Sequence, residues 1–287
     1  MARRGESSGD PPRASVTLAL AVCLVVAGCA GFAGDDGGAR TVNPALAETP
    51  TATPTPPGGF PAGVDRDGVD TEELIAAHRA ALGDGSWTVT LTRTVVGENE
   101  TIEQSQAVAR VDGPRLLYTF ERVRGENRLA TAHWSNATAS ASRRESWRGN
   151  VTLSANPAEA GGPTGLDPTG GAWLSAVFVD MRPEYAGTEQ TANGTVTVLE
   201  ATAGRIERSG VPDRRQVRLR ARVDGAGVVR SLVLQYDVFL GDDPATIRIA
   251  LRTDAVGSTT VPRPEWVDRA FANATGDGSA GNGTSDS

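Results

Sequence analysis

The sequence predicts an α+β fold in which a large, curved antiparallel sheet is covered on its concave face by a few helices. Three observations support this: long stretches that alternate apolar and polar residues, turn sequences between them, and short segments with an apolar stripe of helical spacing. A sheet with one apolar face must bury that face against another layer. The helical segments are the candidates for that layer.

The first expected helix covers residues 71–82. Asp70 suits the N-cap position, and Glu73 completes a capping box. The apolar stripe consists of Leu74, Ile75, His78 and Leu82. On this face we expect His78 to be a core histidine with one satisfied nitrogen, and a functional role is the alternative.

Strands are expected in the middle and in the last third of the chain. They cover residues 86–96, 114–124, 127–134, 137–142, 216–223, 232–240 and 247–252. Residues 224–227 and 241–244 have the composition of hairpin turns. Helices around 173–181 and 265–272 complete the expected cover.

The N-terminus has the organisation of an export signal. Arg3, Arg4 and Arg13 precede an apolar run, and Val26-Ala27-Gly28-Cys29 resembles the lipobox of exported lipoproteins, in which the cysteine receives the lipid. An uncleaved membrane anchor or simple secretion are the alternatives. The export route, general or twin-arginine, stays open.

This organisation divides the chain into four parts. Residues 1–28 form the signal peptide, 29–62 a lipidated N-terminus with a disordered Pro/Thr-rich stalk, 63–272 one globular α+β domain, and 273–287 a disordered tail. We therefore expect the protein on the outer face of the cytoplasmic membrane, anchored through a lipid on Cys29.

Asn-x-Thr sequons support an extracytoplasmic location. Candidate glycosylation sites are Asn99, Asn136, Asn150, Asn193, Asn273 and Asn282. Six sequons are more than chance would place in a chain with so few Asn residues, although a Thr-rich strand protein that generates them by accident is the alternative.

Composition excludes several classes of function. The formal net charge is −7, which argues against a nucleic-acid partner. The chain has no Lys, and all its basic residues are Arg, a composition typical of salt-loving archaea with GC-rich DNA. The chain has only two His residues, no Cys after Cys29, and no G-x-S-x-G, P-loop or HExxH motif. We therefore expect no enzymatic activity, no cofactor and no bound metal.

Two further sets of residues have alternative roles. His133, next to Trp134, is expected to be structural rather than functional. Arg residues that alternate with apolar residues in the last strands form a solvated face paired with acids, or else face anionic head groups; they are Arg218, Arg220, Arg222, Arg248 and Arg252.

The layout of these elements resembles a known group of proteins. Ala77-His78 in the first helix, the hairpin around Asp224–Arg230 and the Pro264-Glu265-Trp266-Val267 segment resemble uncharacterised haloarchaeal lipoproteins, which are similar in layout to lipoprotein-carrier and mycobacterial lipid-binding lipoprotein folds. The resemblance implies an open half-barrel whose concave face holds acyl chains. The candidate cavity residues are Trp87, Leu91, Tyr118, Phe120, Trp173, Leu234 and Tyr236.

The sequence therefore leaves two main functional hypotheses. The first is a cell-surface lipoprotein that binds a lipid or other hydrophobic ligand, and its alternative is a non-catalytic structural or protein-interaction module of the envelope, with an unknown protein partner. A cavity lined by apolar side chains would favour the first hypothesis, and a filled core would favour the second.

Overall fold

The computed structural model describes residues 59–157, 166–208 and 211–276. Along the chain the elements are α1 (Thr71–Leu82), β1 (Ser86–Val96), β2 (Thr101–Asp112), β3 (Arg115–Arg124), β4 (Asn127–Ser135), β5 (Ser140–Glu145), β6 (Val151–Asn156), α2 (Gly171–Met181), β7 (Glu184–Thr191), β8 (Gly194–Arg208), β9 (Val211–Asp224), β10 (Val229–Leu240), β11 (Asp243–Asp254) and α3 (Glu265–Gly276). The signal peptide, Cys29, almost all of the stalk and Asn282 lie outside the described residues.

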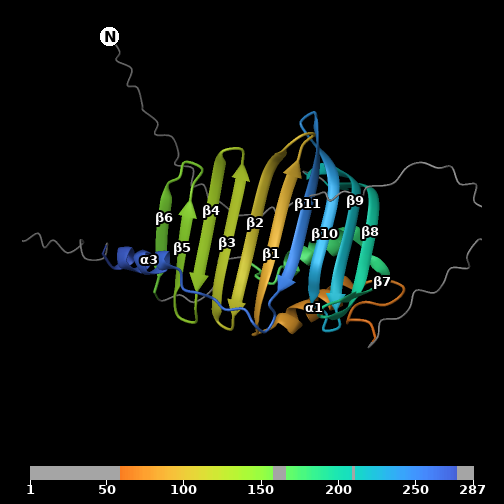
Figure 1. Cartoon of the computed structure of the whole chain (residues 1–287), viewed down its shortest axis with the longest axis horizontal. Helices are drawn as coiled ribbons and strands as arrows, with labels where there is room; N and C mark the ends of the chain where they lie inside the picture. The colour runs from red at the N-terminus through yellow and green to blue at the C-terminus, as the bar shows by residue number, and fades with distance from the viewer. Residues whose placement is uncertain (1–58, 158–165, 209–210, 277–287) are drawn as a thin grey trace, which may run out of the picture.

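All the strands form one antiparallel sheet of 11 strands, which confirms the predicted α+β class (Figure 1). The strand order is β6-β5-β4-β3-β2-β1-β11-β10-β9-β8-β7. The chain meanders outward from β1 to β6, passes through α2 to the opposite edge at β7, and meanders back until β11 pairs with β1. The centre of the sheet therefore joins the first strand to the last.

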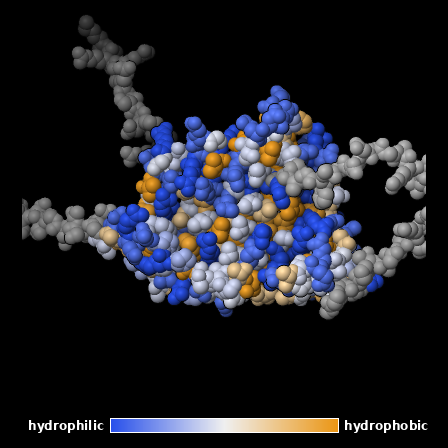
Figure 2. Space-filling model, viewed as in Figure 1, coloured by the Kyte–Doolittle hydropathy of each residue, from blue (hydrophilic) through white to orange (hydrophobic). Residues whose placement is uncertain are grey.

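We call the two sides of the sheet the inner and outer faces. The inner face contains Val89 and Leu91 of β1 and their register partners, and most of the large buried cluster lies on it. Helices α1 and α2 cover this face, and in Figure 1 they lie behind the sheet. The outer face is mostly hydrophilic, with apolar residues scattered over it (Figure 2).

Helix α3 lies on the outer face, and the prediction that it helps to cover the concave face is wrong. It packs on β5 and β6 through a separate small cluster that includes Leu117, Trp134, Val267 and Ala270. Leu116, the neighbour of Leu117, belongs to the inner cluster, because successive side chains of a strand point to opposite faces. Two apolar residues in a row therefore mark a strand buried on both sides.

Local sequence signals position the helices well. Helix α1 has the predicted bounds, and the side chain of Asp70 accepts a hydrogen bond from the Glu73 amide at 3.0 Å. The reciprocal half of the capping box is replaced, because the Asp70 amide donates to the Gly63 carbonyl at 2.8 Å. Helix α3 extends past its expected end and includes Asn273.

The strands were predicted less completely than the helices. The alternation in β1, β3, β4 and β5 is confirmed within a few residues, and so are β9 to β11 with the turn after Asp224. Strands β2, β6, β7 and β8 were not predicted, because their polar content hides the alternation. A bulge at Gln216, where φ is 51°, interrupts the register of β9 with β10.

None of the helices in the described part of the chain has the length and apolar character needed to cross a bilayer.

Candidate functional site

A pocket of about 380 Å³ lies between the inner face and α2. The sheet contributes Val89, Leu91, Ala107, Ala109, Tyr118 and Leu251. The opposite wall consists of Leu166–Pro168, Gly170 and the first turns of α2. This lining is mainly apolar, and the volume falls at the lower end of the range of about 300–1,000 Å³ that small-molecule sites occupy.

Small residues on both walls leave this space open. Ala107 and Ala109 occupy successive inner positions of β2, where larger side chains would reach the helix. Ala172 and Ala176, one turn apart on α2, face the same space. Neighbouring inner positions with large side chains, such as Leu232 and Leu234, form closed core instead.

The wall before α2 is held by Asp167. Its carboxylate accepts hydrogen bonds from the Thr169 amide at 3.0 Å and from the Ala172 amide at 2.8 Å, and it pairs with Arg79 of α1 at 2.8 Å. Burial opposes ionisation of this carboxyl, but hydrogen bonds from the Thr169 hydroxyl, Arg79 and the Ala172 amide outweigh it and hold the pKa of Asp167 below its usual value. Asp167 thus fixes the start of α2 and ties the wall to α1.

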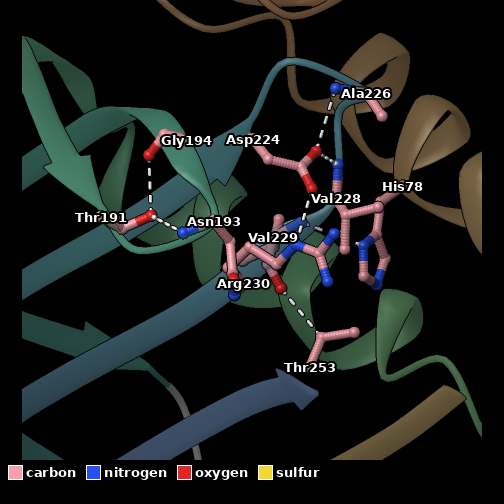
Figure 3. Close-up of polar contacts among 10 residues, drawn as sticks. All are labelled: His78, Thr191, Asn193, Gly194, Asp224, Ala226, Val228, Val229, Arg230 and Thr253. Atoms are coloured by element: carbon pink, nitrogen blue, oxygen red, sulfur yellow. Dashed lines mark hydrogen bonds and ion pairs between the residues drawn. The ribbon is translucent and has the colours of Figure 1, made fainter. Parts of the chain in front are cut away.

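His78 of α1 ties the same wall to the sheet. Its Nδ1 accepts a hydrogen bond from the Val229 amide at 3.2 Å (Figure 3), so the ring is neutral with its proton on Nε2. Nε2 then donates to the Thr169 carbonyl at 3.1 Å. Burial is the largest effect on this group and lowers the pKa of His78. The expected core role is found, but with both nitrogens satisfied rather than one.

The hairpin that contains Val229 is held by hydrogen bonds and an ion pair of its own. Asp224 accepts hydrogen bonds from the amides of Ala226 and Val228 at 3.0 Å and pairs with Arg230 at 2.6 Å (Figure 3). Thr253 of the neighbouring strand donates to the Val229 carbonyl at 2.9 Å. His78 therefore binds to a rigid part of the sheet.

A charged cluster lies on the inner face next to the pocket. Glu103 of β2 is only 6% exposed and forms ion pairs with Arg93 of β1 and Arg122 of β3. The Arg122 guanidinium also lies 5.9 Å from the ring centre of Trp147, which is exposed. Two guanidinium groups therefore share one carboxylate.

Tyr236 lies beside this cluster on the inner face of β10. Its ring is 5.1 Å from the Arg214 guanidinium, which pairs with Asp180 of α2 at 3.8 Å. Tyr236 is 1% exposed, and its hydroxyl has no hydrogen-bond partner in the part of the chain that the structure describes. Burial raises the pKa of Tyr236 to about 12, although Arg214 and Arg93 oppose the shift.

Three of the seven predicted cavity residues, Leu91, Tyr118 and Trp173, line the pocket. The other four do not. Trp87, Leu234 and Tyr236 are fully buried, and Phe120 packs at the margin of the core. Alternation identifies which residues face inward, but it does not distinguish filled positions from empty ones.

The sequons within the described residues lie mainly in turns. Asn99, Asn150 and Asn193 are exposed in the β1–β2, β5–β6 and β7–β8 turns, and Asn273 is exposed on α3. Asn136 is half-buried in the β4–β5 turn, and its side chain accepts hydrogen bonds from the Thr138 amide and hydroxyl and from the Ala139 amide.

His133 has a structural setting on β4, where Nδ1 lies 3.0 Å from the Ser142 hydroxyl. The arginine ladder lies on the outer face, and several of its members are paired with acids as expected. Arg220 pairs with Glu189 and Glu200, and Arg222 pairs with Glu189.

Sequence reasoning missed the Arg93–Glu103–Arg122 cluster. A signal existed in β1, where Arg93 interrupts the inward series between Leu91 and Val95. Its meaning depends on Glu103, which lies in a strand that was not predicted. No group of three or more His, Cys, Asp or Glu side chains is placed to hold a metal ion within the described residues.

The fold and the pocket define an α+β protein with one broad antiparallel sheet and an apolar site beneath the connection that crosses it. The chain belongs to the family of unknown function DUF7537, which it matches over residues 14–270. An uncharacterised family was expected, whereas a haloarchaeal origin stays a prediction. The curated proteins include no match.

Solved structures that are similar to this chain include a LolA superfamily protein and a MucA/MucB complex. The LolA superfamily protein NE2245 from Nitrosomonas europaea is 10% identical, with 68% of this chain and 96% of that chain covered and a TM-score of 0.23. The Pseudomonas aeruginosa MucA/MucB complex is 8% identical, with 68% and 100% covered and a TM-score of 0.11. At these TM-scores the likenesses carry no argument about the ligand.

Proposed function

We propose that this protein is a non-catalytic, lipid-anchored binding protein that holds a hydrophobic ligand in the pocket between the inner face and α2. The observation that carries the proposal is the pocket itself, which is lined by Leu91, Leu251 and Trp173 and kept open by alanines on both walls. Close packing is the rule in protein interiors, so an apolar space of this size suits an apolar guest.

The test is ligand binding by the full chain with Cys29→Ser, so that no anchor lipid competes for the pocket. A neutral fluorescent probe and mass spectrometry of an organic extract report occupancy. We expect Ala176→Trp, which fills the pocket from α2, to weaken probe binding at least about tenfold, or about 1.4 kcal/mol. Ala107→Trp is a second filling variant from the sheet.

The matched control is Ala250→Trp, because Ala250 lies on the outer face of β11, away from the pocket. It should bind the probe as the parent does. A clean extract and no probe binding by the folded parent would end this proposal and leave the structural or protein-interaction module of the envelope.

The proposed location rests on the Val26-Ala27-Gly28-Cys29 lipobox and the exposed sequons. The protein from its native cells should partition into detergent, and Cys29→Ser should move it to the aqueous phase. Peptides with Asn99, Asn150 and Asn193 should carry glycan mass. Unchanged partition of the Cys29→Ser variant would contradict lipidation.

A further inference from the structure

The apolar pocket and the charged cluster belong to one continuous strip of the inner face. In strand register, Leu91 of β1 lies opposite Ala107 of β2. Arg93 follows Leu91 by two residues along β1 and therefore lies on the same face. On β3 the corresponding step leads from Phe120 to Arg122. Two residues of a strand span about 7 Å, so the cationic row adjoins the row that lines the pocket.

Helix α2 borders the same strip with apolar residues. Ala172 and Ala176 line the pocket, and Val179 follows at helical spacing on that side. Val179 is 58% exposed, which makes it one of the few large apolar side chains on the surface of the described chain. Val179 therefore adds an exposed apolar side chain to α2 about one turn beyond Ala176, which lines the pocket.

The charges of the cluster do not balance. Arg93 and Arg122 together face one carboxylate, that of Glu103. The Nε atoms of both arginines are buried and have no hydrogen-bond partner in the described residues, and the Tyr236 hydroxyl nearby shares this condition. The Arg93 and Arg122 side chains are 19% and 39% exposed, whereas that of Glu103 is only 7% exposed. Buried donors are costly unless an acceptor satisfies them.

The arginines of the outer face differ in this respect. There Arg220 and Arg222 meet two carboxylates, those of Glu189 and Glu200, whose side chains are 32% and 44% exposed, whereas Glu103 is a single carboxylate at 7%. Exposed and balanced pairs need no further partner, because water solvates whatever charge is left. The imbalance on the inner face, next to an apolar pocket, therefore points to a ligand.

Resting on the proposed function, we propose that the ligand is a single-chain amphiphile with one anionic head group. Its apolar chain lies in the pocket between β1–β3 and α2, and its carboxylate or phosphate oxygens accept hydrogen bonds from Arg93 and Arg122. Arginine presents several donors in a planar fork that matches such oxygens. The pocket volume of about 380 Å³ favours one chain over several.

The experiment compares three probes that share one chain and differ in the head: palmitic acid, its neutral methyl ester and hexadecyl phosphate. Binding to the full chain with Cys29→Ser is measured by displacement of the neutral fluorescent probe, at a pH that ionises the acid. We expect the acid, the phosphate or both to bind about tenfold more tightly than the ester, and the order of the two identifies the head group.

Two substitutions should move this preference in opposite directions. Arg122→Gln keeps the Arg93–Glu103 pair and should reduce the preference for the anion about three- to tenfold, with little effect on the ester. Glu103→Gln removes the competing carboxylate and should increase the preference. Arg220→Gln on the outer face is the control, and thermal unfolding verifies that each variant is folded.

The outcomes separate the two proposals. Equal binding of ester and anions, unchanged by Arg122→Gln, would overturn the anionic head group and leave the hydrophobic pocket in place. Absence of binding for all three probes would overturn both proposals.

Discussion

Replacing His78 by Leu tests whether the buried imidazole links α1, the pocket wall and the sheet. The change removes the hydrogen bonds to the Val229 amide, which is buried, and to the Thr169 carbonyl, which is partly buried. A buried unsatisfied group costs about 1–3 kcal/mol. We therefore expect the free energy of unfolding to fall by about 2–5 kcal/mol, measured by denaturant unfolding with tryptophan fluorescence.

The same site predicts a pH dependence. Burial lowers the pKa of His78 in the folded state, so the unfolded chain binds more protons once the pH falls below the ordinary value of 6.5. The stability that His78 contributes is therefore complete above this pH and declines below it, by at most about 1.4 kcal/mol per pH unit. Asp167 acts in the same direction, but only at pH values below its ordinary 3.8.

The matched control is Arg79→Gln, which breaks the other link from α1 to the wall. The Arg79 side chain is 48% exposed, so its pair with Asp167 contributes at most about 1 kcal/mol. This variant should keep the decline of stability between pH 7 and pH 5.5, whereas His78→Leu should show a smaller one. Equal pH dependence in the parent and in His78→Leu would refute the reasoning.

Three further changes test the fold. Gly227→Ala should lower the unfolding free energy by about 1–3 kcal/mol, because φ is +85° and the added Cβ would lie 2.9 Å from the Ala77 Cβ. The control Gly225→Ala, whose added Cβ would have no atom within 4 Å, should lower it less. Equal losses in the two variants would contradict this explanation. Val267→Ala, at a fully buried position under α3, should cost about 1–3 kcal/mol, and an unchanged unfolding midpoint would show that α3 does not stabilise the outer face. Arg220→Gln should change the unfolding free energy by less than about 1 kcal/mol despite two ion pairs, and a larger loss would show that the outer ladder stabilises the sheet.

The alternation of apolar and polar residues predicted part of the candidate site. Alternation in β1 and β3 placed Leu91 and Tyr118 on the inner face, and both line the pocket. The same pattern selected Leu234 and Tyr236, which are closed in the core. Whether an inward residue faces a partner or a space depends on the size of residues in other elements, above all Ala107 and its neighbours on β2 and α2.

The sequence by itself determined the elements whose signals are local. The cap at Asp70 and the apolar stripe specify α1, and the two-residue period specifies β1 and the strands from β9 to β11, because each signal lies within one short stretch of chain. Only the tertiary structure decided that β1 pairs with β11, that α3 covers the outer face, and that Arg93 and Arg122 share Glu103. These features come from contacts between segments far apart in the chain, and periodicity within a segment does not specify which partner it meets.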